Sequence, residues 1–193
     1  MPENRRVKRD FIEISGAGAT LQAERFEQII SVADIEHSQR FQDYCKSCPH
    51  YGKNLACPPS TPYFADYAGK SSSARVICYR ISLTGAEPGV ESQKTAHREA
   101  GQLLARELAQ YLKQGHKVAG AGFCRSCPTC AAENGETVCR KPAERIFSLE
   151  AMGVNVDALL KKSFGFGLEW TRGNEKASYL CVPGAVIYDE KLV

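Results

Sequence analysis

The chain lacks any long hydrophobic run and any strong excess of charge. No apolar stretch approaches the roughly 18 residues that a membrane helix needs. The N-terminal segment is charged and has no apolar region typical of a secretory signal. The formal charge is only +3 over 193 residues, which gives no argument for nucleic-acid binding. We therefore expect a cytoplasmic protein with no membrane partner and no nucleic-acid partner.

Several enzyme motifs are also missing. The sequence has no Walker A loop and no nucleophile elbow, and Gly16 and Gly18 alone do not make a nucleotide-binding fingerprint. No catalytic residue can be named on this basis, and enzymatic activity stays an open question.

Cysteine, in contrast, is abundant: the chain contains nine. Thiols stay reduced in the cytoplasm, so clustered cysteines there indicate metal ligands or redox groups rather than a disulfide framework. The odd number also argues against complete internal pairing. Seven of the nine fall into two short stretches, residues 45–59 and 124–142.

The second stretch has the spacing C-x2-C-x2-C-x8-C, formed by Cys124, Cys127, Cys130 and Cys139. A C-x2-C-x2-C run is typical of chains that wrap an iron–sulfur cubane, because each thiolate can reach a different iron atom. Zinc sites usually take cysteines in pairs from separate knuckles. We therefore interpret the stretch as a [4Fe–4S] site, with zinc and unligated thiols as alternatives.

The first stretch has three cysteines, Cys45, Cys48 and Cys57, and repeats the spacing of the last three cysteines of the second stretch at an offset of 82 residues. Gln42 stands where the fourth cysteine would be. We interpret this stretch as a second metal site with a missing local ligand. The candidates for that ligand are His37, His50, Cys78 and Cys181; alternatively, the metal keeps an open position for a substrate.

The rest of the pattern predicts one domain over residues 1–193, of the α/β or α+β class, with helices packed on a single sheet that carries both cysteine loops. Alternating or β-branched segments predict strands at 11–14, 75–83, 117–121 and 179–188, the last interrupted at Pro183 and Gly184. Apolar periodicity predicts helices at 20–35, 92–114 and 143–152, and a short helix that Asn155 caps and that runs to Leu160.

The cysteine stretches, with the residues around them, resemble a family of predicted metal-binding proteins, domain of unknown function 2284. The resemblance rests on Cys45-x2-Cys48-x2-Tyr51-Gly52 with Cys57-Pro58-Pro59, on the second cysteine stretch, and on the segment from Ser148 to Val156. It spans roughly residues 45–188. The resemblance implies metal binding through these cysteines and no settled activity. It also implies that the segment with Glu150 packs beside the second site, with Glu150 facing the site or exposed on a helix.

Our leading hypothesis is an iron–sulfur protein that transfers electrons to or from a redox protein partner, or that serves as the redox subunit of a larger reductase. One alternative is a module in which zinc stabilises two irregular loops for an interaction role. Another is an enzyme that binds substrate at an open metal position beside Cys45, Cys48 and Cys57. The sequence leaves the oligomeric state open.

Overall fold

The structure, a computed structural model, describes residues 7–16, 19–84, 90–170 and 177–189. Within these ranges the chain forms one mixed sheet of six strands in the order β1-β2-β3-β6-β4-β5. All neighbouring pairs are antiparallel except β4 and β5, which are parallel. The strands are β1 (Lys8–Gly16), β2 (Ala19–Ser31), β3 (Ser73–Ser82), β4 (Lys117–Gly120), β5 (Phe147–Ser148) and β6 (Tyr179–Tyr188). This is an α+β fold, as the sequence predicts.

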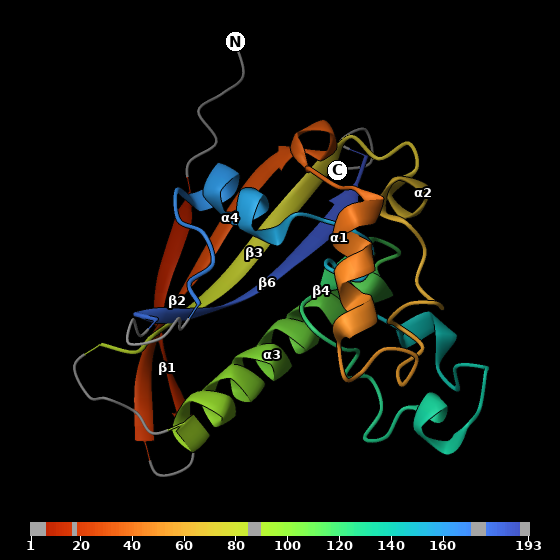
Figure 1. The fold of residues 1–193 in the computed structure, drawn as a ribbon. Helices are drawn as coiled ribbons and strands as arrows, with labels where there is room; N and C mark the ends of the chain where they lie inside the picture. Colours follow the sequence, from red (N-terminus) through yellow and green to blue (C-terminus); the bar gives the residue numbers. More distant parts are fainter. Residues whose placement is uncertain (1–6, 17–18, 85–89, 171–176, 190–193) are drawn as a thin grey trace.

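Helices cover both faces of the sheet (Figure 1). The long helix α3 (Val90–Lys113) packs on one face through an apolar stripe that includes Leu104 and Leu108, which confirms the predicted helix. Helix α4 (Val156–Phe164) packs on the other face, and the Asn155 side chain caps it by accepting a hydrogen bond from the Ala158 N–H. The shorter helices are α1 (Gln39–Asp43), α2 (Phe64–Ala68) and the 3-10 turns η1 (Val32–Asp34), η2 (Tyr44–Ser47), η3 (Ala131–Asn134) and η4 (Pro142–Glu144).

The helix predicted at residues 20–35 is wrong, because this segment is strand β2 followed by a 3-10 turn. Both faces of β2 are covered: Leu21 and Ala23 lie under α3, whereas Phe26 lies under α4. Apolar residues therefore occur on both sides of the strand and mimic helical spacing. Cross-strand charge pairs favour the sheet instead, since Glu24 lies opposite Arg80 and forms an ion pair with it.

Two further predictions need correction. Residues 143–152 do not form a helix, because after η4 the chain makes strand β5 and then a turn that ends at Gly153, whose φ is +83°. Strand β6 is not interrupted at Pro183, which pairs with Cys78 of β3. Strand β4 pairs with β6 only as far as Ala119 and Ala185. At Pro183 the β4 side of β6 therefore has no strand hydrogen bonds, and the missing N–H of proline disrupts none there.

Both cysteine loops lie at the β4 side of the sheet, away from β1 (Figure 1). The turn that leaves β4 begins the second loop, and the first loop lies between α1 and α2. None of the helices in the described residues is long and apolar enough to cross a membrane.

We predict that Gly184→Ala destabilises the protein by about 1–3 kcal/mol, because the new methyl group has no room. A Cβ at this position would lie 3.0 Å from the backbone oxygen of Ala119 and 3.0 Å from a methyl carbon of Leu104. Urea unfolding measures the loss. Gly120→Ala is the matched control, because a Cβ there would lie 3.3 Å from a methyl carbon of Ile146 and 3.7 Å from one of Leu108, with no backbone atom so close, so its loss should be smaller. Equal effects of the two changes would contradict this account of packing.

Candidate metal centre

The second cysteine loop starts where β4 ends. Gly122 has a φ of +69° and turns the chain away from the sheet towards Cys124. The Leu149 N–H donates to the carbonyl oxygen of Gly120 at 2.9 Å, which holds the end of β4 against the segment after β5. The start of the loop is therefore fixed by sheet hydrogen bonds, whereas the rest contains only the short turns η3 and η4.

All four cysteines of this loop line one small pocket, with a cavity volume of about 20 Å³. The structure thus brings together the four thiols that the C-x2-C-x2-C-x8-C spacing selects. All four are partly buried. The residues are Cys124, Cys127, Cys130 and Cys139.

The first loop forms part of the wall of the same pocket, through Asn54, Leu55 and Ala56. The Leu55 N–H donates to the Cys130 sulfur at 3.4 Å, and Arg145 Nη1 donates to the Leu55 carbonyl oxygen at 3.3 Å. The backbone of a single residue, Leu55, therefore ties the first loop to the second. The two loops form one region and not two separate sites at opposite ends of the fold.

The three cysteines of the first loop are also near one another. The pKa of Cys57 is raised to about 12, and burial is the largest cause. The neighbouring charges of Cys45, Cys48, Glu150 and Cys124 raise it further. Burial raises the pKa of Cys45 as well, with further contributions from Glu150 and Cys48. Short turns shape this loop, such as the bond from the Cys48 N–H to the Cys45 carbonyl oxygen at 3.0 Å.

The thiols do not converge on a point. In the described ranges of the chain, no group of three or more His, Cys, Asp or Glu side chains is arranged to hold a single metal ion. Four of the seven loop cysteines line one pocket, but in these ranges they are not placed as a closed tetrahedral site.

Glu150 lies between the two loops. Its carboxylate accepts hydrogen bonds from the Ser148 hydroxyl and from the backbone N–H of Gly122, at the start of the second loop. Burial raises the pKa of its carboxyl group. Its charge in turn raises the pKa of Cys45 and Cys57, so it faces the first loop. The exposed helical position that the sequence allowed for Glu150 is therefore wrong.

The other candidates for the missing ligand of the first loop have other contacts. His37 Nδ1 is 2.8 Å from the Tyr63 hydroxyl, and the His50 ring packs against Phe123 with centroids 5.7 Å apart. Cys78 is fully buried on β3, where burial and the neighbouring Cys181 raise its pKa. The sequence could not have selected Glu150 over these residues, since only the fold brings it beside the cysteines.

Several cations lie at the pocket. Arg140, Lys141 and Arg145 all line it. Arg140 pairs with Glu136, and Lys141 pairs with Glu144 at 3.0 Å, so both are held near the loop. The pKa of Arg140 is raised mainly by Glu136, and Cys127 and Cys130 contribute to the same shift. The positive charge therefore lies where it can offset thiolates.

A protein-family profile described as "Predicted metal-binding protein (DUF2284)" matches residues 28–182. The chain belongs to this family. The match includes both cysteine loops, Glu150 and most of the sheet, so the residues gathered here lie within the part of the chain that defines the family. No curated protein and no solved structure matches the chain.

For the folded, metal-free protein we predict that Cys57 resists alkylation at about pH 8. A thiol with a pKa of about 12 has roughly a thousandfold less thiolate at that pH than an ordinary cysteine. Mass spectrometry after iodoacetamide treatment gives the modification rate, and urea restores the ordinary rate. Cys48 is exposed and serves as the accessible reference. Equal alkylation rates of Cys57 with and without urea would contradict a thiol whose pKa is raised by burial and by neighbouring negative charge.

Proposed function

We propose that the second loop holds a [4Fe–4S] cluster through Cys124, Cys127, Cys130 and Cys139, and that the protein transfers electrons. The observation that supports this most is the single pocket lined by all four thiols. The C-x2-C-x2-C spacing of the first three thiols also fits a cubane better than tetrahedral zinc. When bound, such a cluster supplies a one-electron carrier.

The surroundings of the pocket favour a reducible centre. A cluster with four thiolates is negative, and Arg140, Lys141 and Arg145 can offset that charge. The hydrogen bond from the Leu55 N–H to the Cys130 sulfur lowers electron density on that ligand. Both effects raise the reduction potential of an iron–sulfur centre. The proposal places the protein in the reducing cytoplasm with a redox protein as its partner.

We propose a second centre at Cys45, Cys48 and Cys57, with Glu150 as its fourth ligand. A carboxylate is costly to bury without a cation, and no lysine or arginine contributes to the pKa of Glu150 in the described part of the chain. A metal ion beside the three thiols would provide that positive charge. Two centres in adjoining loops would allow electrons to pass between them.

Cys127→Ala should remove the visible absorption, iron and sulfide of the second-loop centre, because it deletes one of four ligands. Absorbance, iron and sulfide analysis of protein purified without oxygen measures this loss. Cys181→Ala is the matched control, since Cys181 lies on β6 outside the pocket. Full retention of the cluster in Cys127→Ala would refute the ligand assignment. Colourless wild-type protein that carries zinc would refute the redox role and favour a zinc-stabilised interaction module.

Glu150→Gln should weaken metal binding at the first loop by about 10–100-fold, because a neutral amide replaces a carboxylate. The measurement is chelator competition in a Cys127→Ala background, where the remaining metal belongs to the first loop. Circular dichroism checks that each variant folds, and Glu36→Gln is the control because Glu36 is exposed. Unchanged affinity in Glu150→Gln would leave the first loop with an open metal position and would favour substrate binding there.

A further inference from the structure

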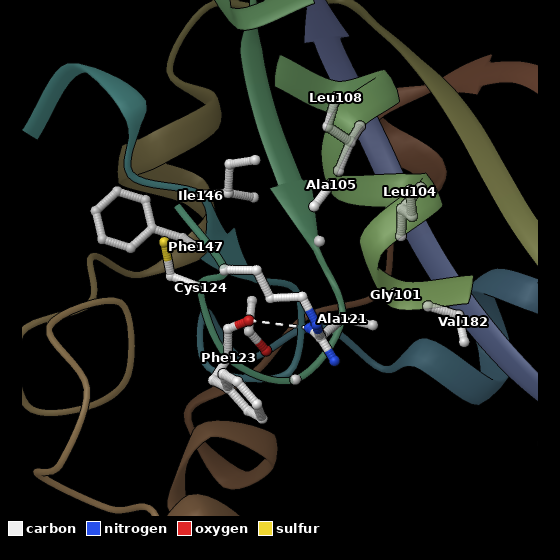
Figure 2. A pocket seen from close by; sticks show the side chains of 14 residues that line it. Gly101, Leu104, Ala105, Leu108, Ala121, Phe123, Cys124, Ile146, Phe147 and Val182 are labelled. Atoms are coloured by element: carbon white, nitrogen blue, oxygen red, sulfur yellow. Dashed lines mark hydrogen bonds between the residues drawn. The ribbon is translucent and has the colours of Figure 1, made fainter. Parts of the chain in front are cut away.

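A large groove lies on the other side of the segment that carries Cys124 and Cys127. It runs between helix α3 and the second loop and has a volume of about 950 Å³, at the upper end of the range for small-molecule sites. Figure 2 shows the adjoining smaller pocket, with Cys124 beside Phe147 on one side and Gly101 and Ala105 of α3 on the other. The groove therefore lies directly beside two of the proposed cluster ligands.

Positive charge dominates this groove. Arg98, Arg106, Lys113 and Arg125 line it, against one carboxylate, Glu144. That carboxylate is already paired with Lys141, outside the groove lining, at 3.0 Å. Within the described ranges, Arg106, Lys113 and Arg125 form no ion pair. A concave surface lined by one sign of charge concentrates ligands of the opposite sign.

One of these cations is fixed in position. Arg125 Nη1 donates to the carbonyl oxygens of Phe123 at 3.1 Å and Ala121 at 3.4 Å, and its guanidinium lies over the Phe123 ring. Gly101 makes room for it, since a Cβ there would come within 2.8 Å of the guanidinium. A guanidinium held in this way loses little freedom when it binds a phosphate or carboxylate.

The groove also has an apolar part. Ala105 and Ala109 lie one helical turn apart on α3, and their short side chains leave the hollow open. Leu112 and Ile146 add apolar wall, and the exposed Phe123 ring borders it. Apolar walls with a few fixed polar groups are the usual composition of a small-molecule site.

We propose that this groove binds an anionic small molecule of nucleotide size. Its phosphate or carboxylate groups contact Arg106, Arg125 and Lys113, and its apolar or aromatic part lies against Ala109 and Phe123. The binding itself depends on the charge and shape of the groove and not on the metal. Only the placement of the ligand beside an electron carrier rests on the proposed function.

The test is isothermal titration calorimetry of the full chain with ADP, pyrophosphate, citrate and uncharged adenosine. ADP should bind, and adenosine should not. Pyrophosphate and citrate separate phosphate from carboxylate recognition, and either can bind more weakly than ADP because it lacks the ring. Added salt should weaken the binding. Cluster content is measured separately by absorbance, so loss of the cluster and loss of ADP binding are distinguished.

Two variants test charge and shape independently. Arg106→Glu should weaken ADP binding by about tenfold or more, as expected for the loss of a charge-assisted contact. Ala109→Phe fills the hollow without a change of charge and should weaken binding as strongly. Lys162→Glu, on α4 at the opposite face of the sheet, should bind ADP as the wild type does. Arg106 is exposed, so its replacement should leave folding intact.

Three results would overturn the proposal. The first is the absence of binding for ADP, pyrophosphate and citrate alike. The second is equal ADP affinity in Arg106→Glu and the wild type. The third is a protein that binds a poly-glutamate peptide but not ADP, and whose affinity for the peptide is the same in Ala109→Phe. That result would identify the groove as a docking surface for an acidic protein, because such docking needs the positive charge of the groove but not its depth.

Discussion

The backbone of Leu55 connects the two cysteine loops. Its N–H donates to the Cys130 sulfur and its carbonyl oxygen accepts from Arg145, so both of its polar groups are used across the contact between loops. Without this contact the wall of the cysteine pocket that the first loop forms would be absent. The position of Glu150 near Cys45 and Cys57 depends on the same docking, because Glu150 follows the second loop in the chain.

The physical reason for such a contact is the cost of ordering the loops. Residues 45–59 and 124–142 contain only short 3-10 turns, and each ordered residue costs about 1–2 kcal/mol of conformational entropy. The sheet anchors only the start of the second loop, through Gly120 and Leu149. A metal centre bound by the thiols would offset the remaining cost, since metal affinity contributes to folding free energy where the ligands are otherwise loosely held. Ligand binding and folding of these loops are thus expected to be coupled.

The sequence predicted what depends on local spacing and missed what depends on tertiary contacts. The four cysteines that line one pocket follow from their spacing, and α3 follows from its apolar stripe. Strand β2 was mistaken for a helix, because Leu21 and Phe26 face opposite layers of the core and hide the alternation of a strand. Glu150 could not be connected with the first loop, because about a hundred residues separate them. The groove escaped prediction for the same reason: α3 and the second loop meet only in the folded chain.

Helix α3 connects the sheet to the cysteine region by using its two sides differently. Leu104 and Leu108 on one side are buried against the sheet, whereas Arg98 and Arg106 on another side line the groove. Gly101 lies between these sides and costs the helix about 1 kcal/mol relative to alanine. The missing side chain gives space to the guanidinium of Arg125 from the second loop. A shift of α3 on the sheet would therefore move Arg125, and with it the segment of Cys124. The groove and the cysteine pocket are therefore two sides of one wall, the segment that carries Cys124 and Cys127.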